Sequence, residues 1–349
     1  MKQNSFFSGL SQERQQPRVI AEMSGNHNRS LERALEIVEA AAETGAHALK
    51  LQTYTADTMT LPVSTGEFFI NDARNLWNGY SLHELYEIAH TPWEWHEALF
   101  RAGEERGLTV FSTPFDETAV DFLEELGCPF YKVASFENNH LPLLRKVGAT
   151  GKPVIVSTGM ATLAELDECV RTLRESGCGK LVLLQCTSTY PATPENSNLR
   201  TIPHMGDLFG CEVGLSDHTL GIGAAIAAVA LGATVIEKHF TLSRAEGGVD
   251  AAFSLEPKEM AALVVETKRA WQALGGIHYG TTEAEKLSAR FRRSIYIAQD
   301  VKSGDVLTSE NLRVIRPGYG LEPKYYEILL GRRINRDLPK GSAMDWSYV

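Results

Sequence analysis

The sequence predicts a closed (β/α)₈ barrel followed by a small β-rich domain. Eight short apolar runs recur between residues 18 and 275, and a longer stretch with helical periodicity follows most of them. Beyond residue 276 the pattern changes to short strands and frequent turns. The chain has 349 residues, of which 43% are hydrophobic and 22% charged, so one large domain and one small one can each bury a core.

The eight apolar runs are predicted strands, and most of them end in polar residues. They span residues 19–22, 48–52, 109–113, 131–135, 154–157, 181–186, 213–218 and 235–239. Eight alternating strand and helix units within about 250 residues are typical of a TIM barrel. An open doubly wound sheet is the structural alternative, but no Gly-x-Gly-x-x-Gly pattern follows the first run.

Amphipathic stretches between the runs are predicted helices, over residues 30–44, 92–106, 117–126, 162–176 and 257–274. Ser30 and Thr162 can cap two of them, and Glu165 completes a capping box with Thr162.

A longer insertion, residues 53–91, follows the second strand and is rich in aromatic residues. Loops at this end of a barrel build active sites, so the insertion is a candidate specificity element. A packed surface excursion is the equally open alternative.

We expect four segments along the chain. Residues 1–17 form an N-terminal extension, 18–276 the barrel, 277–290 a linker and 291–349 the small domain. The small domain should contain strands near 294–298, 304–307 and 314–318, and a turn at 339–341.

Charge and composition exclude several partners. The formal net charge of −10 disfavours nucleic acid and anionic membranes, because both attract a basic face. No apolar run reaches the length of about 18 residues that a membrane helix needs. Residues 1–17 are polar and lack a signal core, which predicts a cytoplasmic protein. The five cysteines form no Cys-x-x-Cys pair and are expected to be buried.

Polar residues at the C-terminal ends of the strands are the candidate active site, because those ends carry the active sites of barrels. Two lysines, Lys50 and Lys132, occur there among five hydroxyl side chains, those of Thr113, Ser135, Ser157, Ser188 and Ser216. Together they predict an anion pocket for a small phosphorylated or carboxylated metabolite. The alternative is that some strands are shorter and these charges are solvated or paired with each other.

Two histidines, His218 and His239, end the seventh and eighth strands, which are neighbours in a barrel. Two imidazoles with a nearby carboxylate make a catalytic rather than a structural metal site. Mn²⁺ or Mg²⁺ is preferred over Zn²⁺, because no cysteine or third histidine is obviously placed to complete a tetrahedron. The alternative is one core and one surface histidine. His27 is a possible extra polar contact.

Eight ordered motifs resemble the sialic acid synthase family, from about residue 18 to the C-terminus. They lie at residues 21–28, 50–53, 111–116, 131–137, 157–161, 186–191, 215–219 and 237–240. Segments 21–28, 76–77 and 91–96 resemble the branch that makes pseudaminic acid. The N-acetylneuraminate and legionaminic acid branches stay open as alternatives.

The resemblance implies condensation of phosphoenolpyruvate with an N-acetylated amino sugar, 2,4-diacetamido-2,4,6-trideoxy-L-altrose in the pseudaminic acid branch. It implies that the two lysines and five hydroxyl side chains bind phosphoenolpyruvate and that His218 and His239 bind the metal. Ser188 stands where some members have asparagine. The residues implied to approach the sugar or a metal-bound water are Glu22, Gln52, Glu137, Tyr190 and Asp250. Glu22, Lys50 and Lys132 are the implied catalytic groups.

The resemblance also implies that the small domain is an antifreeze-protein-like (SAF) domain. In relatives this domain reaches the partner's barrel in a domain-swapped homodimer, which would bring Arg316 to a site in trans.

Two rival functions come from the residues themselves. One is a metal-dependent aldolase or sugar-phosphate isomerase on the same barrel, with a Schiff-base lysine. The other is a carbohydrate- or ice-binding protein in which the barrel is only a scaffold.

Overall fold

The computed structural model describes residues 6–7 and 16–349. The chain divides into two compact units, with the boundary between Gly275 and Gly276. Most of the predicted extension over residues 1–17 lies outside the described residues.

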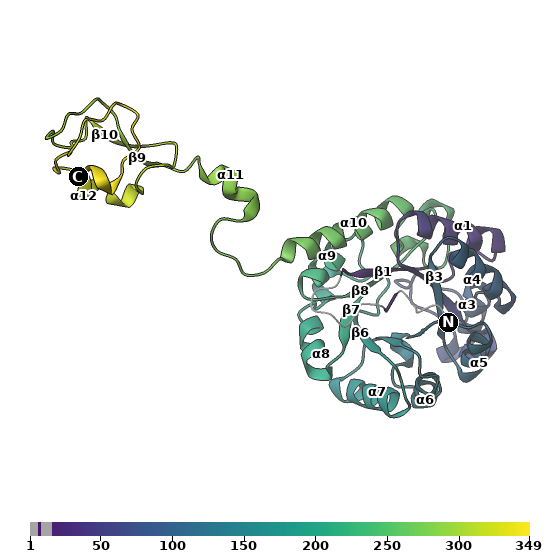
Figure 1. The fold of residues 1–349 in the computed structure, drawn as a ribbon. Coiled ribbons are helices and arrows are strands. Elements are labelled where there is room, and N and C mark those ends of the chain that lie inside the picture. Colours follow the sequence, from purple (N-terminus) through teal and green to yellow (C-terminus); the bar gives the residue numbers. More distant parts are fainter. Residues whose placement is uncertain (1–5, 8–15) are drawn as a thin grey trace. The chain divides into compact units, whose positions relative to one another are not determined.

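The first unit is a closed barrel of eight parallel strands, as predicted (Figure 1). The strands are β1 Arg18–Glu22, β2 Ala48–Thr53, β3 Thr109–Pro114, β4 Tyr131–Val133, β5 Val154–Ser157, β6 Leu181–Cys186, β7 Glu212–Asp217 and β8 Val235–His239. Pairing of β1 with β8 places Glu22 beside His239 and closes the barrel, which excludes an open doubly wound sheet.

Helices surround the strands (Figure 1). The main ones are α1 Leu31–Glu43, α4 His96–Glu105, α5 Glu117–Glu125, α6 Leu141–Ala149, α7 Leu163–Glu175, α8 Thr201–Phe209, α9 Gly223–Ala230 and α10 Pro257–Leu274. Ser30 caps α1, and Thr162 with Glu165 forms the predicted capping box of α7. The helix expected over 92–106 instead begins with a 3₁₀ turn, η2 Trp93–Trp95, before α4.

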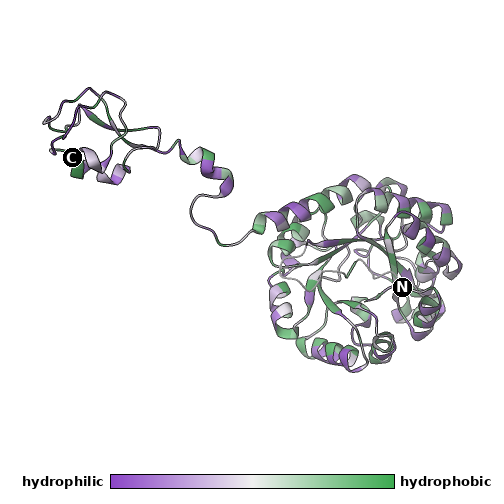
Figure 2. Cartoon of the chain, viewed as in Figure 1, coloured by the Kyte–Doolittle hydropathy of each residue, from purple (hydrophilic) through white to green (hydrophobic). Residues whose placement is uncertain are grey.

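The core lies between the strands and the helices. Figure 2 shows mainly apolar strands and helices of mixed character, as expected for helices with one face on a core. Near the N-terminal end of β4, Phe6 and Phe7 are buried against Phe130, with ring centroids 5.1 and 4.8 Å away. The opposite ends of the strands are therefore the ones left for polar groups. No helix in the described part of the chain combines the length and apolar content needed to cross a bilayer.

The insertion after β2 contains α2 Ala56–Met59, η1 Gly66–Phe68 and α3 Leu82–Ala89. An isolated antiparallel bridge joins Phe69 to Ser81 across the exposed part between η1 and α3. It has little core of its own, so its position depends on contacts with the barrel.

The second unit begins with an exposed stretch that contains η7 Glu283–Glu285 and α11 Lys286–Ala289. β9 Ser294–Ile297 then pairs antiparallel with β10 Leu312–Ile315. The segment expected as a strand near 304–307 makes only an isolated bridge, between Val306 and Arg333. η8 Pro323–Tyr325, α12 Tyr326–Leu329 and η9 Trp346–Tyr348 complete the unit around its own apolar core.

Candidate active site

The C-terminal ends of the strands bring the predicted polar residues together in the first unit. Alternate residues of a strand point to the same side, so one set faces the barrel interior. The members of this set at the polar end are Glu22, Lys50, Gln52, Thr113, Lys132, Ser157, Ser216, His218, Glu237 and His239. All except Gln52 are buried.

Glu237 is the centre of the charge network. Its Oε1 accepts hydrogen bonds from Lys50 Nζ at 2.8 Å and Ser216 Oγ at 3.2 Å, and lies 3.4 Å from Lys132 Nζ. Glu22 Oε2 lies 3.3 Å from Lys50 Nζ, and Gln52 donates to Glu22 Oε1 at 2.9 Å. Two buried ammonium groups therefore share two buried carboxylates.

Burial and pairing act in opposite directions on these groups. Burial raises the pKa of Glu22 to about 7, although Lys50 opposes it. Burial disfavours ionised Glu237, yet Lys132 and Lys50 hold its pKa well below its usual range. Burial alone would lower the pKa of Lys50, but Glu22 and Glu237 outweigh it and raise that pKa. For Lys132 the effect of burial exceeds the attraction of Glu237, so the pKa of Lys132 is lowered. Of these two carboxylates, Glu22 is thus the one that can change protonation near neutral pH.

Hydroxyl groups converge beside Lys132. Its Nζ donates to Ser157 Oγ at 2.7 Å, and the amide of Gly159 donates to Ser135 Oγ at 3.1 Å. A Cβ on Gly159 would stand 2.2 Å from Ser188 Oγ and 2.8 Å from Ser135 Oγ, so only glycine fits there. Thr113 Oγ1 is buried without a hydrogen-bond partner among the described residues. An anion with several oxygens could satisfy these groups.

The two histidines face each other across the ends of β7 and β8, with ring centroids 5.3 Å apart. His218 Nδ1 lies 3.0 Å from the Thr187 carbonyl oxygen. His239 Nδ1 is buried without a hydrogen bond to any described residue and lies 3.9 Å from Asp250 Oδ2. Burial holds the pKa of His239 well below its usual value. A neutral imidazole can bind a metal ion.

A buried ion pair lies next to both histidines in sequence. Lys238 Nζ donates to Asp217 Oδ2 at 2.7 Å and to the Thr219 carbonyl oxygen at 2.5 Å. Because neighbouring strand residues point to opposite sides, this pair faces away from the interior while His218 and His239 face into it. It joins β7 to β8 on the helix side of the barrel wall.

Glu137 lies on the loop after β4, and Tyr190 lies on the loop after β6. Glu137 is half-buried as a residue, but its Oε2 atom is buried and has no hydrogen-bond partner among the described residues. Burial raises the pKa of Glu137 to about 7, with Lys132 opposing. The Tyr190 ring lies 4.5 Å from that of His218, so Tyr190 adjoins the histidine pair. Ser24 donates a hydrogen bond to Asp250, the carboxylate near His239.

Two family models match this chain. Residues 37–279 match the model of the NeuB family, and residues 292–348 match the SAF domain. The chain belongs to the NeuB family. The resemblance to the sialic acid synthase family and the (β/α)₈ fold with a C-terminal SAF domain are thereby confirmed.

Several NeuB-family relatives are similar over nearly the whole chain. A pseudaminic acid synthase of Campylobacter jejuni is 42% identical, over 93% of this chain and 94% of that protein. An N,N'-diacetyllegionaminic acid synthase of Legionella pneumophila is 36% identical, over 95% of this chain and 94% of that protein. A solved N-acetylneuraminic acid synthetase of Leptospira borgpetersenii, in complex with citrate, is 31% identical with a TM-score of 0.69, and the match covers 78% of this chain and 90% of that one.

The histidine pair of this NeuB-family chain fits a divalent ion. The described residues contain no ready-made group of three or more histidine, cysteine, aspartate or glutamate side chains around one point. However, the two imidazoles converge, His239 Nδ1 has no hydrogen bond within residues 6–7 and 16–349, and the Asp250 carboxylate is close. Two imidazoles and one carboxylate leave open positions for water or substrate.

Other predicted residues fall outside the charge network. Arg316 belongs to the second unit, where a cis peptide bond joins it to Pro317, and its proposed role in trans stays a prediction. His27 is buried with its ring 5.5 Å from that of Trp95 and Nε2 3.3 Å from Thr91 Oγ1, so it supports the insertion instead of contacting the network. Glu237 lies at the end of the eighth predicted strand and within the last motif, but no role was predicted for it.

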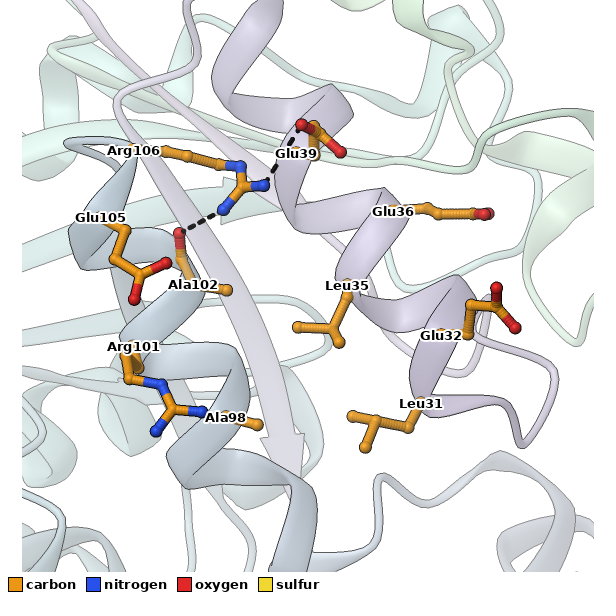
Figure 3. A pocket seen from close by; sticks show the side chains of 10 residues that line it. All are labelled: Leu31, Glu32, Leu35, Glu36, Glu39, Ala98, Arg101, Ala102, Glu105 and Arg106. Carbon is orange, nitrogen blue, oxygen red and sulfur yellow. Dashed lines mark hydrogen bonds and ion pairs between the residues drawn. The ribbon is translucent and has the colours of Figure 1, made fainter.

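A groove also lies between α1 and α4 on the outside of the barrel (Figure 3). Leu31, Leu35, Ala98 and Ala102 contribute its apolar part. Arg106 donates to Glu39 at 3.2 Å at one end, and further carboxylates belong to Glu32, Glu36 and Glu105. Carboxylates outnumber arginines there, so an anionic substrate suits the barrel interior better.

Proposed function

We propose that this chain condenses phosphoenolpyruvate with 2,4-diacetamido-2,4,6-trideoxy-L-altrose and water to form pseudaminic acid and phosphate. The observation that carries the proposal is that two buried lysines meet at Glu237 in one barrel end, where Ser157 and Ser216 join the same network beside the histidine pair. The choice of branch is supported by the higher identity to a pseudaminic acid synthase than to a legionaminic acid synthase.

Phosphoenolpyruvate would bind through its anionic groups. Lys50 and Lys132 supply the positive charge, and the hydroxyl donors are those of Thr113, Ser135, Ser157, Ser188 and Ser216. Thr113 Oγ1 is the clearest unsatisfied donor, because it is buried without a partner among the described residues. Glu22, Gln52, Glu137, Tyr190 and Asp250 would surround the sugar.

Mn²⁺ or Mg²⁺ would be held by His218 and His239, with Asp250 nearby, and would polarise the aldehyde oxygen of the open-chain sugar as a Lewis acid. His239 is suited to this role because its Nδ1 is buried and has no hydrogen bond to a described residue.

The reaction forms one carbon–carbon bond and one carbon–oxygen bond, the latter to water, and breaks the carbon–oxygen bond to phosphate. C3 of phosphoenolpyruvate attacks the aldehyde carbon, and positive charge develops at C2, where water adds. Glu22, with its pKa near 7, takes a proton from that water, and the tetrahedral centre collapses with loss of phosphate. Lys50 and Lys132 stabilise the charge on the departing phosphate.

The decisive experiment measures phosphate release from phosphoenolpyruvate with a panel of N-acetylated sugars. The 2,4-diacetamido-2,4,6-trideoxy-L-altrose substrate should give the highest kcat/KM. A higher value for N-acetylmannosamine or for the legionaminic acid precursor would reassign the branch. With ¹⁸O in the bridging position of phosphoenolpyruvate, the label should leave in phosphate, and label found in the sugar acid would refute the proposed bond cleavage.

The rival function of an aldolase with a Schiff-base lysine has one observation in its favour. The lowered pKa of Lys132 is a property of Schiff-base lysines. Borohydride treatment in the presence of substrate should nevertheless leave Lys132 unmodified if it acts as an ammonium group. A trapped adduct would favour an aldolase. A carbohydrate-binding protein with a scaffold barrel would release no phosphate at all.

The assembly belongs to the same proposal. We expect a domain-swapped homodimer in which Arg316 reaches the partner's barrel. Arg316→Ala mixed with an inactive Lys132→Ala chain should regain activity toward half that of wild type per heterodimer, because one site then holds both wild-type groups. No recovery despite demonstrated subunit exchange would place Arg316 in its own chain's site or in none.

A further inference from the structure

The insertion after β2 is tied to the barrel end at Trp77. Most residues between η1 and α3 are exposed, but Trp77 is half-buried. Its indole Nε1 donates to the Val249 carbonyl oxygen at 2.8 Å. Val249 directly precedes Asp250 and packs so closely over Gly25 that a Cβ there would stand 2.4 Å from Val249 Cγ2. One indole hydrogen bond therefore connects the insertion to the loop that carries Asp250.

Aromatic rings continue from Trp77 to the histidine pair. The ring centroid of Trp77 lies 5.9 Å from that of Tyr190, and Tyr190 lies 5.3 Å from Phe253. Phe253 in turn lies 4.8 Å from His239. The only polar atom of the indole is already bonded to Val249, Phe253 has none, and Tyr190 contributes a single hydroxyl. The side of the site formed by Trp77, Tyr190 and Phe253, here named the aromatic wall, is therefore mainly apolar.

We propose that Trp77 is a positioning and specificity-determining residue of this site. Its N–H holds the loop that carries Asp250, and its ring extends the aromatic wall against which a methyl group of the sugar packs. The inference rests on the proposed function and deepens it. A diacetamido-trideoxy sugar carries two kinds of methyl group, on the acetamido substituents and at C6, and either has the chemistry that the wall would recognise.

The two roles of Trp77 can be separated by two substitutions. Trp77→Phe removes the hydrogen bond to Val249 and keeps an aromatic ring. It should raise KM for the sugar about fivefold, as for loss of one hydrogen bond, and preserve the preference among sugars. Trp77→Ala removes the ring as well. Adding or removing one methyl group of a substrate in an apolar pocket changes kcat/KM by roughly 10- to 200-fold. In the alanine variant, the ratio of kcat/KM between sugars that differ by a methyl group should therefore fall about tenfold.

Two matched sugar pairs identify the methyl group. One pair compares the acetamido substrate with its formamido analogue, and the other compares the 6-deoxy sugar with its 6-hydroxy analogue. Loss of discrimination in either pair supports the proposal and names the methyl group. KM for phosphoenolpyruvate should not change, because its pocket around Lys132 and Ser157 is held by separate contacts.

Trp271→Phe is the matched control. Trp271 lies on α10, partly buried against the core outside the barrel. This variant should leave sugar KM and discrimination unchanged. Thermal unfolding of all three variants should show folded proteins, and Trp77→Phe provides the test if the alanine variant does not fold.

A readout without turnover separates this inference from the proposed function. In saturation-transfer NMR with the sugar alone, irradiation of aromatic protein protons should label the sugar methyl groups in wild type and less in Trp77→Ala. If wild type releases no phosphate with any sugar, the proposed function is refuted. The saturation-transfer measurement would then decide by itself whether sugar methyl groups pack on the aromatic wall. Unchanged transfer, unchanged discrimination in both sugar pairs, or an equal rise in KM for phosphoenolpyruvate would each overturn the role of Trp77.

Discussion

Replacing Glu237 by glutamine should destabilise the ligand-free protein and make it respond more strongly to phosphate. Glu237 Oε1 faces Lys50 at 2.8 Å and Lys132 at 3.4 Å, and all three groups are buried. Removing one partner of a buried ion pair costs about 3–5 kcal/mol, and glutamine keeps a hydrogen-bond acceptor, so we expect the lower end of that range. In a domain of this size a loss of about 3 kcal/mol lowers the melting temperature by about 6 °C.

The second half of the prediction concerns the anion. In wild type a phosphate must compete with Glu237 for the two lysines, whereas in the variant it meets uncompensated charge. Thermal unfolding in the presence of a chelator, with and without inorganic phosphate, should show a larger upward shift for Glu237→Gln than for wild type. A ligand present at about 100 times its Kd stabilises by about 2.7 kcal/mol, so a difference in affinity is readily measured.

Asp167→Asn is the control for this experiment. It removes one negative charge from an exposed pair with Arg171 on α7, which contributes less than about 1 kcal/mol. Equal phosphate shifts in wild type and Glu237→Gln would refute the reasoning that Glu237 neutralises the lysines.

Three further outcomes are expected. The pKa of Glu137 is raised to about 7 in the folded protein, above its ordinary value of 4.5, so the folded state binds more protons between those values and Glu137 lowers stability as pH rises through that window. Urea unfolding from pH 5 to 8 should therefore show the stability of Glu137→Gln improving relative to wild type. Lys132→Met loses a buried charged hydrogen bond, worth about 2–5 kcal/mol, and should raise KM for phosphoenolpyruvate at least about 30-fold in steady-state kinetics. His218→Ala and His239→Ala should each weaken Mn²⁺ binding at least about tenfold by calorimetry, and chelation should abolish activity that Mn²⁺ or Mg²⁺ restores.

Each of these outcomes has a matched comparison. A pH-independent difference between Glu137→Gln and wild type would show that Glu137 does not titrate in this range. Lys152→Met removes a lysine paired with Glu124 outside the barrel and should change KM less than about twofold. His204→Ala removes an exposed histidine of α8 and should leave Mn²⁺ affinity unchanged. Full activity of either predicted metal-binding variant in excess chelator would contradict the metal assignment.

Most of the fold could be predicted from local sequence patterns. The apolar runs predicted every strand of the barrel, because strands covered by helices are buried on both sides and read as continuous hydrophobic segments. Residues 257–274 were predicted as a helix and form α10 Pro257–Leu274. Segment 304–307 was wrong as a strand, since Val306 finds a bridging partner only at Arg333 and is not part of a ladder.

The site was predictable as a location but not as a network. Strand-end positions placed Lys50, Lys132 and the two histidines at one end of the barrel. The central role of Glu237 was missed, because its partners lie on strands far apart in sequence and depend on barrel closure. The contact between Trp77 and Val249 joins loops separated by 172 positions, which no local pattern indicates.

The ion pair between Lys238 and Asp217 has a consequence for how a metal ion would be taken up. It joins β7 to β8 at the residues adjacent to His239 and His218, on the helix side of the barrel wall. The separation of the two imidazoles is thus set when the barrel folds, before any ion arrives. A small metal-folded domain gathers its ligands as it binds, and its affinity includes the free energy of folding. Here an incoming ion would mainly exchange water for nitrogen, so apo and loaded protein should share one backbone conformation at these strands.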